Sequence, residues 1–181
     1  MGSPSTGAGT GKASRPQTRF LIWFPLCLLA GLALLQVPAV DACVERLTGV
    51  LVDVTAAVIH AFGGKALVSG ATLSSPVNGF AVRVENGCNA VNVSVLLWSA
   101  ILVYPAGWKD KVKGIVAGTL LLHSLNLVRI VSLYYLGQYN RSWFDFAHLY
   151  LWEGLIVVDT LAIFWGWAIL VRRSVRHAEA G

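Results

Sequence analysis

Charged residues are what this sequence has least of. Only 13% of its 181 residues are Asp, Glu, Lys or Arg, whereas 56% are hydrophobic and the mean hydropathy is +0.65. A soluble domain usually carries about twice that share of charge. Several apolar runs are near the ~20 residues needed to cross a bilayer core of ~30 Å. The composition therefore excludes an ordinary soluble domain and predicts an integral membrane protein.

The sequence also lacks the signatures of several kinds of site. Its three cysteines are unevenly spaced without a Cys-x-x-Cys pair and its four histidines are scattered, which argues against a zinc site or a disulfide-dense scaffold. No Gly-x-Ser-x-Gly segment lies in an apolar run, which argues against a serine protease of the membrane. The net charge of +5 lies in short clusters beside the apolar runs. We therefore expect no cofactor, no metal and no nucleic-acid partner, and expect a lipid bilayer around the chain.

Four apolar segments are present, at about residues 20–40, 88–104, 114–136 and 143–171. The first is longer than the ~7–15 residues of a signal-peptide core, so we expect a retained transmembrane helix rather than a cleaved signal. Residues 1–18 are rich in Gly, Ser, Thr and Pro and are expected to be a disordered tail. Residues 19–173 are expected to form a single membrane-embedded domain, followed by a second tail at 174–181.

The segment between the first two helices, residues 41–87, has a different pattern. Apolar residues recur at three- and four-residue steps over 41–62, which predicts an amphipathic helix lying along the membrane surface. Residues 66–73 and 80–85, joined by turn residues that include Asn78-Gly79, predict a short β-hairpin. The expected fold class is an all-α integral membrane protein with four transmembrane helices, plus this outer helix and hairpin.

Basic residues predict the orientation of the helices. Nine of the fourteen Lys and Arg residues fall on one side of the four-helix topology: Lys12, Arg15, Arg19, Lys109, Lys111, Lys113, Arg172, Arg173 and Arg176. The positive-inside rule makes that side cytoplasmic. Both termini are then cytoplasmic, and the segment 41–87 faces outward.

Three reactive side chains are expected at one depth near the outer face. Cys88 begins the second helix, Arg129 lies ~23 Å up the third helix, and His148 is early in the fourth. A helix N-terminus lowers the pKa of a thiol. His148 could accept the thiol proton and return it to a leaving amine. Arg129 is costly inside an apolar helix and could stabilise an oxyanion, so we interpret the three as a candidate catalytic site.

Other polar residues have open interpretations. Asn126, one turn before Arg129, could orient it or donate a hydrogen bond, and Asn89 is a candidate supporting residue beside Cys88. Asp145 could orient His148, or form a capping box with Ser142. Glu153 and Asp159 receive no role.

Two non-enzymatic alternatives remain open at this point. In a scaffold, a Cys43–Cys88 disulfide would pin the outer segment to the helices. In a small transporter subunit, polar residues would line an ion path, namely Arg129, His123, Glu153 and Asp159.

Three short segments carry a resemblance to a known family. Asn86-Gly87-Cys88-Asn89-Ala90, Asn126-Leu127-Val128-Arg129-Ile130 and Phe146-Ala147-His148-Leu149 together are similar to motifs of the exosortase/archaeosortase family. The similarity covers about residues 40–171, and the compact chain looks most like exosortase H. One departure is Asn89-Ala90 after the cysteine, where many members have Ser-Gly or Ala-Gly.

The resemblance implies a multi-pass protein of the bacterial inner membrane that acts as a cysteine protease or transpeptidase. Its substrates would be exported proteins with a C-terminal tripartite signal, which consists of a short motif, a transmembrane helix and a basic tail. Cys88 would be the nucleophile, Arg129 the electrostatic stabiliser and His148 the acid and base. Cleavage at the periplasmic face would form a thioacyl intermediate, which water, an acceptor amine, or a glycan or lipid acceptor would resolve.

Overall fold

The computed structural model describes residues 15–180, and most of them lie in helices. In chain order the elements are α1 (Arg15–Leu34), α2 (Pro38–Ala61), β1 (Leu67–Ser69), β2 (Thr72–Ser74), β3 (Ala81–Arg83), α3 (Val91–Val103), α4 (Trp108–Tyr139), α5 (Arg141–Phe146), a π-helical turn (Ala147–Leu151) and α6 (Trp152–Ala180).

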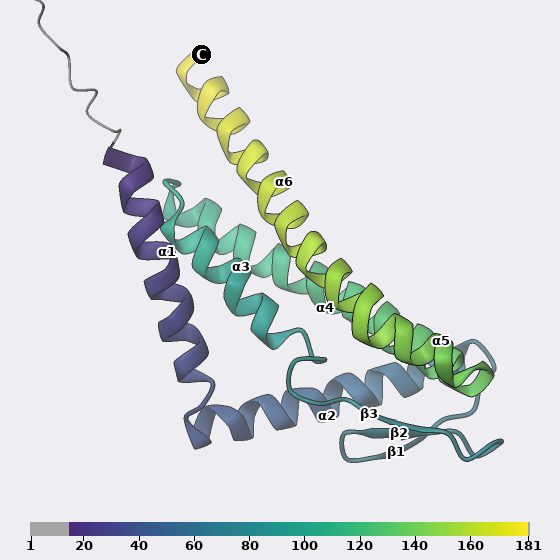
Figure 1. The fold of residues 1–181 in the computed structure, drawn as a ribbon. Helices are drawn as coiled ribbons and strands as arrows, with labels where there is room; N and C mark the ends of the chain where they lie inside the picture. Colours follow the sequence, from purple (N-terminus) through teal and green to yellow (C-terminus); the bar gives the residue numbers. More distant parts are fainter. Residues whose placement is uncertain (1–14, 181) are drawn as a thin grey trace, which may run out of the picture.

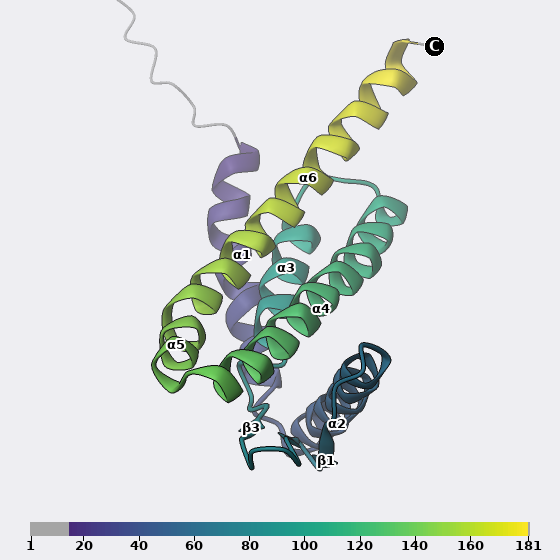
Figure 2. The same cartoon turned by 90° about the vertical axis from the view of Figure 1, so that its right-hand side faces the viewer.

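The long helices and the sheet lie at different ends of the molecule. Figure 1 shows that α1 and α4 run toward the sheet, whereas α3 and α6 run away from it. Figure 2 shows α2 and the sheet together at the same end. The start of α1, the connection from α3 to α4 and the end of α6 therefore all lie at the opposite end.

Two of the three apolar clusters in the described residues hold these parts together. Between the long helices, α3 packs against α1, α4 and α6, and its Leu97 and Ile101 are buried with Leu122 of α4 and Ile156 of α6. At the sheet end, α2 bends away from α1 by 82°. Its apolar face packs on the sheet and on α4, in a cluster that includes Val52, Ile59, Leu73, Val84, Ile130 and Tyr134. The predicted amphipathic helix is thus present, with its apolar side covered by the sheet and α4.

Fewer than four helices of the described residues are long and apolar enough to cross a membrane. Trp108–Tyr139 and Arg141–Ser174 are each long and apolar enough to span, and the bent pair formed by α1 and α2 adds at most one more. The 13 residues of α3 extend over roughly 20 Å, short of a bilayer core of ~30 Å. The turn that carries Cys88 shortens α3 at its start, and Pro105 ends it because the residue before a proline avoids the helical region. The described residues thus contain two or three candidate spans, and the predicted count of four is not confirmed.

The predicted hairpin is a three-stranded antiparallel sheet with strand order β1-β2-β3. The expected strand at 66–73 was wrong, because a turn at Gly70, with φ of +59°, divides it into β1 and part of β2. The expected strand at 80–85 is confirmed in β3. A glycine inside a short apolar run gives too weak a signal to separate a tight hairpin from one longer strand.

Helix boundaries also differ from those predicted. The second helix begins at Val91 rather than at Cys88. The third begins at Trp108, so Lys109, Lys111 and Lys113 lie in its first turns. The fourth continues to Ala180, which makes most of the predicted tail at 174–181 helical. Residues 1–14 of the predicted N-terminal tail lie outside the described residues, and 15–18 belong to α1.

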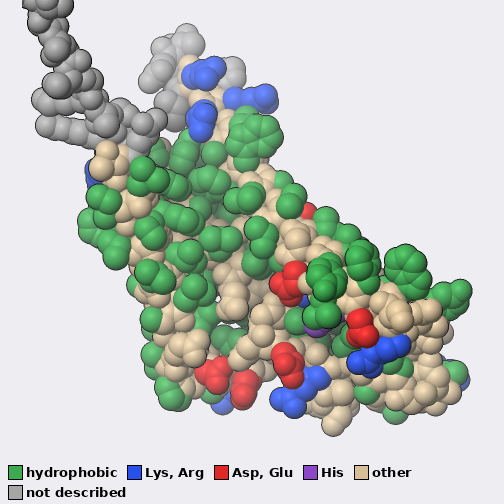
Figure 3. Space-filling view, in the orientation of Figure 1, with side chains coloured by type: hydrophobic (Ala, Val, Ile, Leu, Met, Phe, Trp, Pro, Cys, Tyr) green, Lys and Arg blue, Asp and Glu red, His purple; other side chains and the backbone are tan. Residues whose placement is uncertain are grey.

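The surface matches a chain surrounded by lipid. Figure 3 shows hydrophobic side chains covering the long helices on one face, basic side chains toward the end of α6, and acidic and basic side chains together around α2 and the sheet. Large apolar side chains are exposed along α1, α4 and α6, including Leu21, Leu29, Leu120, Val128, Leu161 and Leu170. So much exposed apolar surface is unfavourable in water and favourable in a bilayer.

Candidate active site

Cys88 lies in a tight turn between β3 and α3. Its backbone N–H donates to the carbonyl of Glu85 over 2.9 Å. Gly87 and Ala90 both have positive φ, at +101° and +62°. A non-glycine residue in this region is strained, and such residues persist where the surrounding structure fixes the backbone.

Asn89 fixes this turn to its neighbours. Its side chain is 1% exposed, and its Nδ2 donates to Oγ1 of Thr48 over 3.0 Å and to Oδ1 of Asn86 over 3.3 Å. Its Oδ1 accepts from the backbone N–H of Val91 over 3.1 Å. Asn89 therefore ties the cysteine turn to α2 and to the first residue of α3.

The structure brings Cys88, Arg129 and His148 together from three separate segments. Sγ of Cys88 lies 3.5 Å from Nε2 of His148. Nη2 of Arg129 donates to the same sulfur over 3.8 Å. His148 is stacked on the ring of Phe144, with ring centroids 5.6 Å apart, which fixes the plane of the imidazole. A thiol, a base and a cation therefore meet at one sulfur atom.

Glu153 is a fourth member of this cluster, although no role for it was predicted from the sequence. Its Oε1 accepts from Nη2 of Arg129 over 3.0 Å. The arginine is 1% exposed and the glutamate 55% exposed, so the pair lies between the protein interior and its surface. A buried guanidinium needs a counter-charge, and Glu153 supplies it.

The π-helical turn explains why sequence periodicity missed Glu153. In a regular α-helix, residues five apart point about 140° away from each other. The turn Ala147–Leu151 has i→i+5 bonding, which brings residues five apart toward the same side. His148 and Glu153 are five apart across this turn, and both face the cluster around Cys88.

Two predicted supporting residues do not make the expected contacts. Asn126 is fully buried, but within residues 15–180 neither its Nδ2 nor its Oδ1 has a hydrogen-bond partner, and Nε of Arg129 also lacks one. Asp145 forms an i,i+4 pair with Arg141 over 3.3 Å rather than orienting His148. The capping box is also wrong, because Oδ1 of Asn140 accepts from the backbone N–H groups of Ser142 and Trp143.

The electrostatics of Cys88 differ from the prediction. Burial raises the pKa of its thiol above the ordinary value of 9.0, Arg129 opposes this shift, and Glu153 and Glu85 add to it. The predicted lowering by a helix N-terminus was wrong, because Cys88 precedes the first residue of α3 by three positions. The resting thiol is therefore protonated at neutral pH and needs a base.

The remaining candidate residues have other environments. All three cysteines, each in the described part of the chain, are free, so Cys43 and Cys88 form no disulfide. Asp159 lines an apolar groove of about 590 Å³ between α4 and α6, and it forms no salt bridge within the described residues. No group of three or more potential metal-ligating side chains occurs between residues 15 and 180.

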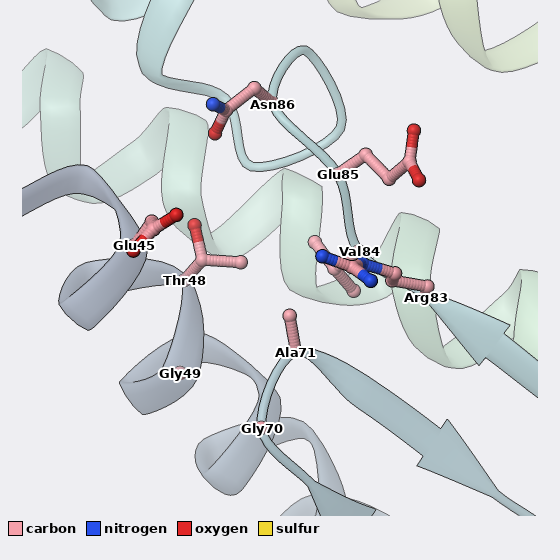
Figure 4. A pocket seen from close by; sticks show the side chains of 9 residues that line it. All are labelled: Glu45, Thr48, Gly49, Gly70, Ala71, Arg83, Val84, Glu85 and Asn86. Carbon is pink, nitrogen blue, oxygen red and sulfur yellow. The ribbon is translucent and has the colours of Figure 1, made fainter. Parts of the chain in front are cut away.

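A cavity of about 550 Å³ adjoins the cysteine turn. Figure 4 shows Glu85 and Asn86 on one side of it, Glu45, Thr48 and Gly49 of α2 on another, and Arg83 pointing from β3 toward α2. Acidic and basic side chains both line the cavity. All of its lining residues belong to the outer segment, residues 41–87, so it does not lie between the long helices.

Comparison with known protein families identifies the family of this chain. Residues 12–171 match the family model described as transmembrane exosortase. The chain belongs to the exosortase family. The match includes the cysteine turn, Arg129, His148 and Glu153, and covers all elements except the end of α6. No curated protein and no solved structure matches the chain.

Family membership gives a general function. Exosortases are membrane proteins with a sorting, transpeptidase-like role that in general uses a cysteine. The resemblance stated from the three motifs is therefore confirmed at the level of the family. The similarity to exosortase H stays a prediction.

Proposed function

We propose that this protein is a cysteine protease or transpeptidase that cleaves the C-terminal sorting signals of exported proteins at the outer face of a bacterial inner membrane. The observation that carries the proposal is the position of one sulfur atom within 3.5 Å of Nε2 of His148 and 3.8 Å of Nη2 of Arg129. A structural cysteine would need neither a base nor a buried cation beside it.

The geometry supports acyl transfer in two stages. His148 takes the proton from the Cys88 thiol as the sulfur attacks the scissile carbonyl carbon. The carbonyl oxygen becomes an oxyanion, which the guanidinium of Arg129 stabilises. The tetrahedral intermediate then collapses, the C–N bond breaks, and His148 gives its proton to the leaving amine. A thioester between Cys88 and the N-terminal part of the substrate remains.

In the second stage the thioester is resolved by water or by an acceptor amine, with a glycan- or lipid-borne group as a further candidate. His148 takes the proton of the incoming nucleophile, which attacks the thioester carbonyl, and Cys88 leaves as a thiol when that proton is returned. Whether the result is hydrolysis or transfer depends on which nucleophile reaches the site. The chemistry at Cys88 is the same in both.

Glu153 and Asn126 have distinct parts in this scheme. Glu153 holds the guanidinium of Arg129 through a single 3.0 Å contact and so positions it beside the sulfur. The amide of Asn126 and Nε of Arg129 are buried and have no hydrogen-bond partner within residues 15–180, so they would be donors to a substrate carbonyl whose binding opens the site to them. Buried donors without partners are costly, and a substrate that supplies the partner recovers that cost in the bound state.

The proposed topology places this chemistry at the periplasmic side. Basic residues gather at the end of the molecule opposite the sheet, where α4 begins and α6 ends, so the positive-inside rule makes that end cytoplasmic. We propose that α1, α3, α4 and α6 all lie in the bilayer, with α3 crossing only part of it. Cys88, in the turn that precedes α3, then lies at the periplasmic end of the helices.

The test is processing of a co-expressed reporter that carries a tripartite C-terminal signal from the same genome. Wild type and Cys43→Ala should cleave the reporter, and Cys88→Ala and Cys88→Ser should not. Cys43 is exposed and free, which makes its substitution a matched control for loss of a thiol. Undiminished cleavage by Cys88→Ala would refute the proposal.

A further inference from the structure

We infer that β3 is a docking strand for the substrate. On this inference, which rests on the proposed function, the extended segment before the scissile bond pairs with the free edge of β3 and runs toward Cys88. The partner is therefore a peptide in β conformation, recognised largely through its backbone.

The free edge follows from the hydrogen-bond pattern of the sheet. The N–H of Val84 donates to the carbonyl of Ala71, and the N–H of Ser75 donates to the carbonyl of Phe80. Bonded positions alternate along an antiparallel pair, so positions 80, 82 and 84 face β2. Ala81 and Arg83 then direct their N–H and C=O groups to the other side, where no residue in the described part of the chain pairs with them.

This edge is both open and held in place. Ala81 and Arg83 are exposed, whereas Leu73 and Val84 on the inner face are buried. The ring of Phe80 packs edge-to-face on Phe144, with centroids 5.6 Å apart, and lies directly against Gly137 of α4. A strand fixed in this way presents its free backbone groups without further ordering.

The backbone groups of this edge and its position near Cys88 favour a peptide as the ligand. Two donors and two acceptors in alternation match an extended backbone, which is how β-strand addition gains affinity. Arg83 lies five residues before Cys88, with the tight Glu85–Cys88 turn between them. Since the scissile carbonyl must reach the sulfur beyond the C-terminal end of β3, the bound segment runs parallel to β3.

The cavity beside the cysteine turn fits the same arrangement. Side chains of paired positions on neighbouring strands stand on the same face of a sheet. Arg83 lines the cavity of about 550 Å³, and in Figure 4 its side chain extends toward α2, so a substrate residue opposite Arg83 is expected on the same face of the sheet as Arg83, near this cavity. Alternate substrate side chains are expected to meet this cavity.

The first test is Ala81→Pro with Val68→Pro as a matched control. Proline at position 81 removes an edge donor and projects a ring toward the added strand, while every β2–β3 hydrogen bond remains. Val68 is the corresponding position at the opposite edge of the same sheet, since Leu67 and Ser69 are the residues bonded to β2. Ala81→Pro should slow reporter processing by about tenfold or more, and Val68→Pro should process at the wild-type rate.

Two results of this test have different meanings. If wild type cleaves the reporter and Ala81→Pro cleaves it equally fast, the inference on β3 is overturned and the proposed function stands. If wild type does not cleave the reporter, the proposed function itself fails. Equal amounts of both variants in the membrane show that the sheet has folded in each.

A cross-linking experiment tests the strand geometry directly. Arg83→Cys is introduced into a chain that also carries Cys27→Ala, Cys43→Ala and Cys88→Ala. Single cysteines are then introduced at successive positions of the reporter segment before the cleavage site. Disulfides should form at every second reporter position, which is the period of a strand. Disulfides at consecutive positions, none at all, or a disulfide between two copies of the enzyme would each overturn the inference.

Discussion

Glu153 and Arg129 shift the pKa of the Cys88 thiol in opposite directions. The guanidinium favours the thiolate, the carboxylate disfavours it, and burial makes the protonated thiol the resting form. In the proposed mechanism the reaction starts from the thiol and depends on His148, because the proton must leave as the carbon–sulfur bond forms. On the proposed function, Cys88 therefore stays protonated until a substrate binds.

The pH dependence of Cys88 alkylation tests this balance. In a Cys27→Ala, Cys43→Ala chain, the midpoint of the iodoacetamide rate should lie above pH 9.0. Glu153→Gln should move the midpoint to lower pH, because a negative charge that disfavours the thiolate is removed. Asp145→Asn is the control, since Asp145 pairs with Arg141 and should leave the midpoint unchanged. An upward shift in Glu153→Gln would contradict the account.

The variant Asn126→Leu tests whether the amide of Asn126 contributes to substrate processing or to the stability of the fold. A buried amide without partners destabilises the fold by roughly 1–3 kcal/mol, so an apolar side chain of similar size should raise the thermal unfolding temperature. The same change should lower reporter processing by about tenfold, because a donor to the substrate is lost. If the unfolding temperature fell, Asn126 would have a structural partner and the assigned role would be wrong.

At the residue scale, the sequence was sufficient to predict that Cys88, Arg129 and His148 lie close together, but not to predict their partners. An arginine in an apolar run and a cysteine where an outer segment turns into a helix are both visible in the sequence. Glu153 was not assignable, because α-helical periodicity directs it away from His148. The state of Cys88 depends on burial by parts of the chain distant in sequence, which no local pattern reports.

At the scale of elements, α4 and β3 together determine where the cysteine turn lies. Gly137 allows the ring of Phe80 to lie against the backbone of α4, and a side chain at 137 would occupy the same space. This contact joins the sheet to the helix that carries Arg129. The distance between Cys88 and Arg129 therefore depends on a glycine that is remote from both.

Gly137→Val tests that dependence. Overpacking at this position should lower the free energy of unfolding by about 1–3 kcal/mol and slow processing, because β3 moves away from α4. Gly166→Val is the matched control, since a Cβ at position 166 meets no atom within 4 Å. Adding Phe80→Ala to Gly137→Val should recover part of the lost activity, and a failure to recover any would argue against this contact as the cause.

Helices were easier to predict than strands in this chain. Apolar runs and Pro105 located the long helices of the described residues, with errors of up to nine residues at their ends. The sheet was only partly predicted, because β1 and β2 have three residues each and their turn at Gly70 lacks the Asn-Gly or Asp-Gly signal of a hairpin. The π-helical turn has no sequence signal that distinguishes it from the α-helix on either side.

For the whole molecule, the arrangement of charge and apolar surface supports one orientation. The sheet, α2 and the active-site cluster lie at one end, and the exposed arginines of α6 lie at the other. Apolar side chains cover the helices between these ends. On the proposed function, the candidate active site is then within reach of an exported protein whose signal helix still lies in the bilayer.

Labelling of the native cysteines tests this orientation. In intact spheroplasts, a membrane-impermeant maleimide should label Cys43, which is exposed on α2, and should not label Cys27 in α1. Cys43 is tested in a Cys27→Ala, Cys88→Ala chain, and Cys27 is tested in a Cys43→Ala, Cys88→Ala chain. Labelling of Cys43 only after the membrane is permeabilised would place α2 on the cytoplasmic side and contradict the topology.

The most direct test of the proposed thiol chemistry is detection of the thioester on Cys88. Wild-type enzyme mixed with the reporter in proteoliposomes and quenched in acid should yield an adduct whose mass equals the enzyme plus the N-terminal reporter fragment. Hydroxylamine should release that fragment, and the adduct should be absent from Cys88→Ala. Cleavage of the reporter by Cys88→Ala, or an adduct that maps to Cys43 or Cys27, would contradict the account.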